Sequence, residues 1–258
     1  MVDLFSDIFA RRDNKLTRLD ARVKLILAIS AVMAVSFSKT VLFPLVIAMA
    51  SVGSLTMVNI PNRIILLRLA APGGMIVVLV MLQMFLTKGD PLLVIPFGHW
   101  ELIATREGLM RGLLLGARVL GAVSVVLLLG AVTPAYKIFH ALRWLGVPAS
   151  WVEIALLVYR YVFTLLDDAA DIAAAQSTRL GYSSVKRSLA SAGILAGTVI
   201  TRSLAQAVRT YEAMTLRGYT GQLPFGPLPR LSGNDWLHVG GGTALLAILY
   251  FLFERWAV

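Results

Sequence analysis

The chain has 258 residues, of which 58% are hydrophobic and 15% are charged, and its mean hydropathy is +0.78. A soluble domain carries about 25% charged residues, so this composition excludes a water-soluble globule. The formal net charge of +10 does not indicate nucleic-acid binding, because the basic residues gather at the ends of apolar segments and in one long region, as in membrane proteins. No cysteine is present, which excludes a disulfide framework, a thiolate metal site and a cysteine nucleophile.

Five apolar segments are predicted to cross the membrane, because a bilayer core takes roughly 20 apolar residues in helical form. In chain order they are Leu25–Ser38, Val41–Ile60, Leu69–Thr87, a span from about Arg111 to Ala135, and Trp236–Phe253. Residues 61–68, with Arg63 and Arg68, are expected to form a basic turn before the third span. Leu92–Pro96 and His99–Thr105 look extended and predict a small extracellular hairpin or loop before the fourth.

Residues 134–234 are predicted to form a separate module, and residues 1–133 and 235–258 to hold the first four spans and the last one. Pro134–Leu145 is expected to be a short amphipathic helix. Ser150–Leu180 and Val185–Leu216 are two long helices that carry charges along their length, and residues 218–234 are a proline-rich linker. Helices with charges spread in this way lie in the membrane interface or pack on each other more readily than they cross a bilayer. The predicted fold is therefore an all-α polytopic membrane protein with an amphipathic helical module.

The basic residues predict the orientation of this layout. They crowd the N-terminal segment, residues 61–68, and region 134–234, which has ten Lys or Arg against five acidic residues. All three segments lie on the same side if region 134–234 does not cross the membrane, and the positive-inside rule places that side in the cytoplasm. The N-terminus is then cytoplasmic and the C-terminus external.

The two long helices end in related sequences. Residues 176–182 and 214–219 each carry an arginine with Gly and Tyr close behind, Arg179 with Gly181 and Arg217 with Gly218. A glycine just beyond a helix allows a left-handed cap, and an arginine in the last turn suits the negative end of the helix dipole. One such end is an ordinary cap. Two of them 38 positions apart favour a paired docking device, since a guanidinium can bind carboxylates or cap a partner's carbonyl groups.

At these ends and elsewhere the chain resembles the T component of energy-coupling factor (ECF) transporters, in particular the CbiQ type of cobalt systems. The two arginine segments resemble the family's coupling-helix signatures, usually Ala-Arg-Ser or Ala-Arg-Gly and here Thr-Arg-Leu and Leu-Arg-Gly. The other matching segments, which spread the resemblance over nearly the whole chain, are Asn14–Leu25, Leu115–Leu120, Thr133-Pro134, Ala141–Pro148 and Tyr159–Phe163.

The resemblance implies a non-catalytic subunit, without a cofactor, in the plasma membrane of a prokaryote. Its partners would be two cytoplasmic ATPases, which receive Arg179 and Arg217, and a CbiM-like substrate-binding membrane subunit, the S component. Its role would be to transmit ATPase movement to that subunit for cobalt uptake, with nickel as the next candidate cargo. Arg160 and the acidic residues Asp167, Asp168 and Asp171 would serve module packing or partner contacts.

A second function remains open, because residues 167–171 match the D-D-x-x-D pattern that holds Mg²⁺ and diphosphate in prenyl-transfer enzymes. Asp167 and Asp171 are one helical turn apart and could share a hard cation. The alternative is a membrane prenyltransferase of the UbiA type. Such enzymes need a second aspartate-rich cluster, and apart from Asp3 and Asp7 near the start the chain has no further acidic pair within five residues. A solvated or internally paired acidic face is therefore favoured.

Small residues in the fourth span predict close helix packing. Gly108, Gly112 and Gly116 recur every four residues, a spacing that lets two helices approach closely. Packing within this chain is favoured, and contact with another subunit is the alternative. Arg118 in the same span is expected either to reach the outer surface or to form a buried structural pair. No phosphate-binding G-x-x-x-x-G-K-[ST] loop occurs, and the three histidines are too isolated to form a metal site. A transported metal would therefore bind to another subunit.

Overall fold

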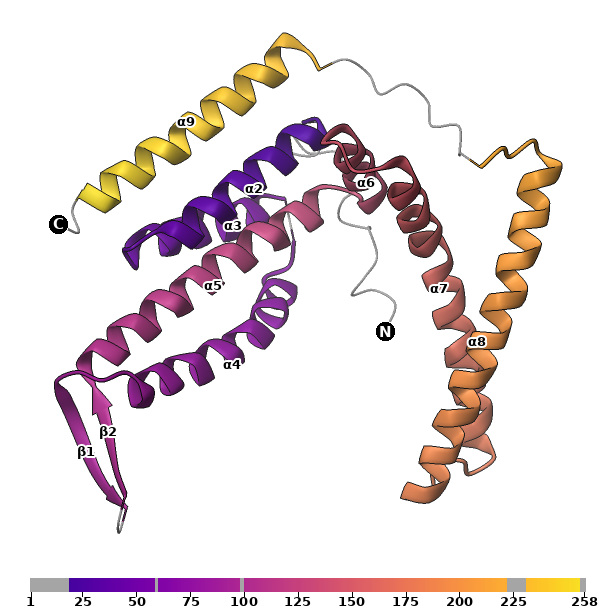
Figure 1. Ribbon diagram of the computed structural model, residues 1–258, viewed down its shortest axis with the longest axis horizontal. Helices are drawn as coiled ribbons and strands as arrows, with labels where there is room; N and C mark the ends of the chain where they lie inside the picture. The colour runs from indigo at the N-terminus through magenta and orange to yellow at the C-terminus, as the bar shows by residue number, and fades with distance from the viewer. Residues whose placement is uncertain (1–18, 59, 98–99, 222–230, 256–258) are drawn as a thin grey trace. The chain divides into compact units, whose positions relative to one another are not determined.

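The computed structural model describes residues 19–58, 60–97, 100–221 and 231–255, and almost all of them are helical (Figure 1). This confirms the predicted all-α polytopic fold. The helices are α2 (Ala21–Phe37), α3 (Leu42–Met57), α4 (Asn62–Leu86), α5 (Arg106–Val132), α6 (Ala135–Trp144), α7 (Ala149–Thr178), α8 (Val185–Leu216) and α9 (Gly233–Arg255). The chain divides into two compact units, residues 1–141 with 229–258, and residues 142–228.

Among the described residues, five helices are long and apolar enough to cross a membrane, namely α4, α5, α7, α8 and α9. Three of them correspond to predicted spans. The first two predicted spans form the shorter helices α2, of 17 residues, and α3, of 16 residues, near the lower limit of about 17 residues for a spanning helix. Length and hydropathy alone therefore do not separate α7 and α8 from the spans, and their place in a cytoplasmic module stays a prediction.

The structure corrects the bounds of two predicted spans. α4 begins at Asn62, so Arg63 and Arg68 lie within its first two turns and not in a basic turn. α5 begins at Arg106 and not near Arg111, because Thr105 caps it by accepting a hydrogen bond from the Gly108 N–H at 3.2 Å. α5 also stops at Val132, three residues before the predicted end. Pro134 explains this, since proline disfavours helical geometry in the residue before it.

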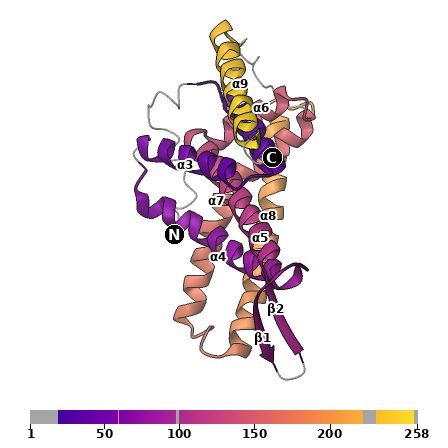
Figure 2. The same ribbon diagram turned by 90° about the vertical axis from the view of Figure 1, so that its left-hand side faces the viewer.

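Of the hairpin and the loop expected between the third and fourth spans, the structure shows the hairpin. β1 (Pro91–Phe97) and β2 (Trp100–Thr105) pair in antiparallel register, with Phe97 opposite Trp100. The strands extend from the end of α4 and the start of α5 (Figures 1 and 2). Residues 98–99, and with them the predicted turn at Phe97-Gly98, lie outside the described part of the chain.

One of two buried hydrophobic clusters in the described part of the first unit lies where α2, α3, α5 and α9 meet. Val35, Phe43, Ile47 and Val125 are buried there. The ring of Tyr250 from α9 packs edge-on against Phe43, with 5.5 Å between ring centroids. α9 is the last described helix. It is thus held by side chains of helices near the start of the chain.

A polar cluster joins the same helices at the C-terminal end of α2. Arg118 of α5 donates hydrogen bonds from Nε and Nη2 to the Ser38 carbonyl oxygen, at 3.0 and 2.6 Å. Ser38 donates its hydroxyl to Glu254 Oε1 at 3.2 Å, and the Lys39 N–H donates to the same oxygen. Of the two interpretations of Arg118, the structure shows a structural pairing, and its acceptor is a backbone carbonyl group.

Candidate functional site

The two arginine-bearing helix ends have the same backbone geometry. Arg179 and Arg217 are both the C-cap residues of their helices, with φ/ψ of −91°/16° and −91°/10°. In the first end the N–H of Leu180 bonds to Ser177 O at 3.1 Å and that of Gly181 to Gln176 O at 2.8 Å. This pair of hydrogen bonds defines a Schellman cap.

The second end repeats those hydrogen bonds position by position. The N–H of Gly218 bonds to Thr215 O, and that of Tyr219 bonds to Met214 O, both at 3.0 Å. The arginine therefore has the same position in both caps. α6 also ends in a Schellman cap, at Gly146, but its C-cap residue is Leu145, so an arginine at this position distinguishes the two long helices.

The structure corrects the role expected for Gly181. The left-handed residue of the first cap is Leu180, with φ of 57°, whereas the equivalent residue of the second cap is Gly218, with φ of 82°. α7 ends two residues earlier than predicted, at Thr178, which moves the left-handed position from Gly181 to Leu180. A leucine in this conformation is strained, because its Cβ approaches a backbone carbonyl oxygen.

Gly181 is needed for a different reason, a close approach between α8 and the end of α7. A Cβ at this position would lie 2.7 Å from Ser191 Oγ and 2.8 Å from Gln176 O. The buried Ser191 donates its hydroxyl to Gly181 O at 3.0 Å, and Gln176 donates from Nε2 to Ser191 O at 3.0 Å. Tyr182 completes the set by donating to Gln176 Oε1 at 2.7 Å. These contacts fix the first helix end on α8.

The strained leucine gives a stability prediction. Leu180→Gly is expected to raise the free energy of unfolding by about 1 kcal/mol, because glycine adopts the left-handed conformation without the Cβ clash. Leu180 is 65% exposed, so little apolar burial is lost. The reciprocal change Gly218→Leu is expected to lower it by about the same amount. Denaturant titration of the chain in detergent micelles measures both free energies of unfolding, and changes of the same sign for the two substitutions would contradict this account of the caps.

The two arginines lie at opposite ends of one antiparallel helix pair. α8 runs back alongside α7 (Figure 1), and the 32 residues of α8 span about 48 Å at 1.5 Å per residue. Arg179 and Arg217 are both exposed, and neither guanidinium binds another described residue. They are thus two separate cationic contacts, and not one combined site.

The acidic segment of α7 lies along the same helix pair. Asp168 forms an ion pair with Arg202 of α8, with 3.3 Å between Oδ1 and Nη1, while Asp167 and Asp171 are exposed. Arg160 lies over the ring of Tyr161, 5.7 Å from its centroid. No group of three potential metal ligands occurs among the residues that the structure describes. Of the three aspartates, Asp168 alone pairs across α7 and α8 among the described residues.

The three predicted packing glycines all face α4. A Cβ on Gly108 would lie 2.3 Å from Gln83 O, one on Gly112 3.0 Å from Val80 Cα, and one on Gly116 2.7 Å from Ile76 Cγ2. α4 and α5 therefore approach each other closely along this glycine face.

Comparison with known proteins places the chain in a family. Residues 12–225 match the family described as CbiQ, cobalt transport protein. The chain belongs to the CbiQ family. The CbiQ family assignment and the apolar helices together identify the chain as a multi-pass membrane protein and a transporter component.

Some individual relatives of the chain carry CbiQ or CbiMQ in their names. The uncharacterised protein MJ1089 of Methanocaldococcus jannaschii is 30% identical over 81% of this chain and 79% of its own length. The cobalt transport protein CbiQ of Rhodobacter capsulatus is 34% identical over 54% of this chain and 57% of its own length. A protein of Methanocorpusculum labreanum, named a putative fused cobalt transport protein CbiMQ, is 29% identical over 60% of this chain and 24% of its own length.

Sequence reasoning missed two groups that shape the site in this CbiQ-family chain. Gln176 and Ser191 link the end of α7 to α8 across 15 positions, and no local motif marks such a pair. Thr210 of α8 donates to the hydroxyl of Tyr161 on α7 at 3.0 Å, across 49 positions. A sequence signal for the second contact was available, because tyrosine and threonine stand on otherwise apolar helix faces. Their hydroxyl groups need a hydrogen-bond partner when another helix buries them.

Proposed function

We propose that this chain is the energy-coupling membrane subunit of an ATP-driven cobalt importer of the ECF type. The observation that carries the proposal is the pair of matching Schellman caps, each presenting an exposed arginine, at opposite ends of α7 and α8. A separation of about one helix length, about 48 Å, suits two partner subunits better than one. Each arginine contacts one of two cytoplasmic ATPases, and residues 134–234 and the N-terminus lie in the cytoplasm.

The helix pair is built to transmit movement between these contacts. Ion pairing of Asp168 with Arg202 and the hydrogen bond from Thr210 to Tyr161 join α7 to α8 along their length. The Gln176–Ser191 contact joins them near the turn. When the ATPases move together on binding nucleotide, the two helix ends follow, and the change in angle between α7 and α8 reaches the membrane-embedded partner.

The cargo is held by a second membrane subunit in this proposal. The relative named CbiMQ supports a CbiM-like substrate-binding partner, since its name joins the two proteins in one chain. Cobalt is the proposed cargo because the family is described as cobalt transport protein. The chain itself contributes no cofactor and no catalytic group, and the acidic segment of α7 serves packing or partner contacts.

Purification of the tagged chain in mild detergent, from cells that contain its natural partners, tests the proposal. We expect two ATPase subunits and a small membrane protein that binds cobalt to be recovered with it. ATP hydrolysis by the purified complex provides the functional readout. Recovery of the chain alone under several mild conditions would contradict the proposed assembly, and recovery of a prenyl-diphosphate-dependent activity would support the UbiA-type alternative.

A further inference from the structure

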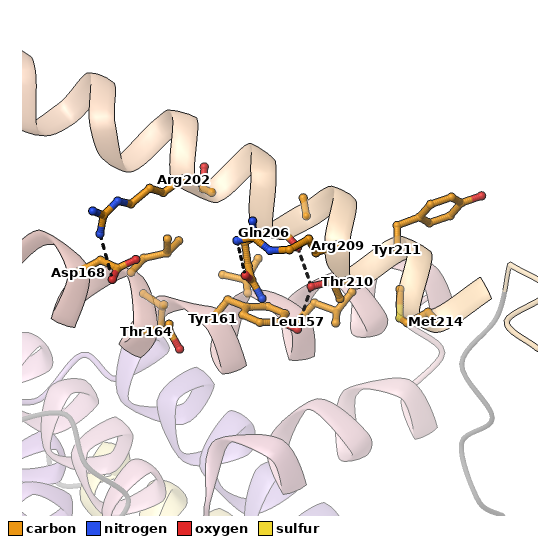
Figure 3. Close-up of a pocket in the computed structure, with 15 residues that line it drawn as sticks. Leu157, Tyr161, Thr164, Asp168, Arg202, Gln206, Arg209, Thr210, Tyr211 and Met214 are labelled. Carbon is orange, nitrogen blue, oxygen red and sulfur yellow. Dashed lines mark hydrogen bonds and ion pairs between the residues drawn. The ribbon is translucent and has the colours of Figure 1, made fainter. Parts of the chain in front are cut away.

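The α7–α8 helix pair has a cavity on each of two opposite faces, with the hydrogen bond from Thr210 to Tyr161 between them (Figure 3). The first face is mostly apolar, and of the two cavities only the one on this face is lined by Val158, Val162, Leu165, Ala207 and Tyr211. The cavity on the second face has a volume of about 720 Å³ and is lined by Arg160, Arg209 and Arg217, among others. We call this second cavity the basic groove.

The basic groove carries three positive charges that no carboxylate of its lining balances. Arg160 of α7 and Arg209 and Arg217 of α8 are all exposed, and no acidic residue of either helix lines the groove. Arg209 donates from Nη2 to Gln206 Oε1 at 3.0 Å, and Arg160 lies over the ring of Tyr161. Both of these contacts are with neutral groups, so the groove keeps its excess of positive charge.

The basic groove is continuous with the second helix end. Gly218 and Tyr219, which form the Schellman cap behind Arg217, also line the groove. A protein that covers Arg217 therefore lies against the groove and shields Arg160 and Arg209 from water. A charge that loses its water without gaining a partner is strongly unfavourable. The protein at this helix end must therefore supply carboxylates, which a guanidinium can bind through two parallel hydrogen bonds.

The first helix end is built differently. The end of α7 is closed on α8 there, because Gln176 and Gly181 are both hydrogen-bonded to Ser191. The next arginine along the chain, Arg187, donates from Nη1 to Ser183 Oγ at 3.0 Å. The two helix ends thus share the geometry of the cap but differ in the surface beside it.

We propose that the basic groove receives an acidic segment of the ATPase that contacts Arg217, with carboxylates at Arg160 and Arg209. This inference rests on the proposed coupling function and adds that the two ATPase contacts are unequal, because the contact at the end of α8 uses three arginines. A free anion would leave the apolar side chains of Leu157 and Met214, which also line the groove, uncovered. A protein segment covers these side chains and pairs the arginines at the same time.

Photo-crosslinking beside each helix end tests the proposal with Arg179 and Arg217 kept in place. Ser177→Cys and Thr215→Cys stand two residues before these arginines, at exposed positions, and neither lines the basic groove. The full-length chain is labelled at either cysteine with benzophenone maleimide and assembled in mild detergent with its ATPases below saturation. Arg160→Gln with Arg209→Gln is expected to reduce capture of ATPase from position 215 by at least about tenfold. Capture from position 177 should stay unchanged.

Two further variants separate loss of charge from damage to the helix pair. Arg160→Lys with Arg209→Lys keeps both charges and should retain most of the capture from position 215. Arg202→Gln is the matched control for Arg209→Gln alone, because Arg202 lies on the same helix and, of the two cavities, lines only the first. It should leave capture from both positions unchanged. Circular dichroism checks that the helices persist in every variant.

The outcomes distinguish this proposal from the coupling function on which it rests. Full capture from position 215 in the double Gln variant, or equal losses at both positions, would overturn the proposal for the groove and leave the coupling function standing. Absence of capture from both positions with all arginines present would contradict the coupling function itself. Retained capture with loss of a co-purified phosphatidylglycerol, detected by native mass spectrometry, would overturn the proposal by assigning the groove to a lipid headgroup.

Discussion

Reversing both helix-end charges, in Arg179→Glu with Arg217→Glu, is expected to abolish ATPase association and cobalt uptake. Both guanidinium groups are exposed and bind no other described residue, so within the described part of the chain they are available to a partner. A hydrogen bond to a charged group contributes about 1.5–3 kcal/mol, so each single reversal is expected to weaken ATPase binding by at least about tenfold. Affinity capture of the ATPases by the tagged chain measures association, and uptake of labelled cobalt measures function.

Two controls separate docking from damage to the helix. Glutamate at a helix C-terminus also opposes the dipole, at a cost of about 0.3–1 kcal/mol, whereas Arg179→Gln and Arg217→Gln remove the charge without that cost. The Gln variants should therefore lose most of the association while keeping the unfolding transition of the unmodified chain. Arg111→Glu makes the same charge change at an exposed position of α5 and should leave association intact. Normal association in the double Glu variant would refute the coupling role of these arginines.

Filling the glycine face of α5, by Gly112→Leu, is expected to force α4 and α5 apart. The new side chain would meet the Val80 backbone, with Cα 3.0 Å and O 3.2 Å from the added Cβ. A backbone in the middle of a helix cannot move aside as a flexible side chain can. Overpacking of this kind costs about 1–3 kcal/mol, occasionally more. We expect a clear fall in the melting temperature and in the yield of monodisperse chain in detergent.

The same helix provides the control for this substitution. Gly130 lies in α5, is exposed and would have nothing within 4 Å of an added Cβ. Gly130→Leu should therefore be tolerated, and helix propensity favours leucine by up to about 1 kcal/mol. Equal losses of stability in Gly112→Leu and Gly130→Leu would contradict the account, because they would show that close packing against α4 is not the reason for glycine at position 112.

Local sequence patterns predicted most of the helices and strands. They could not predict contacts between residues far apart in the chain. The bounds Val185–Leu216 were predicted correctly, because Ser184 is a strong N-cap and a break follows at Gly218. The cap of α7 was placed wrongly, since a shift of two residues in the helix end changes which residue is left-handed. Spacing in α5 indicated the glycine face, but only the packing of α4 shows what it contacts.

The polar contacts illustrate the same limit. Arg118 bonds to Ser38 across 80 positions, and Lys24 donates from Nζ to Val132 O across 108. Both acceptors are backbone carbonyl groups at or near helix ends, where such groups lack a partner within the helix. Composition can indicate that a buried arginine needs an acceptor. It cannot choose among the carbonyl groups that several helix ends provide.

Photo-crosslinking from the two helix ends tests the central claim most directly. The chain has no native cysteine, so Arg179→Cys and Arg217→Cys each create a unique attachment point for a benzophenone maleimide. The loss of each arginine weakens docking, so the labelled chain is assembled with an excess of ATPase. With both positions labelled, our account predicts a product in which one chain is joined to two ATPase subunits, and each single variant should capture one. The account would be contradicted if the doubly labelled chain were joined to only one ATPase subunit, or if neither labelled position captured an ATPase subunit.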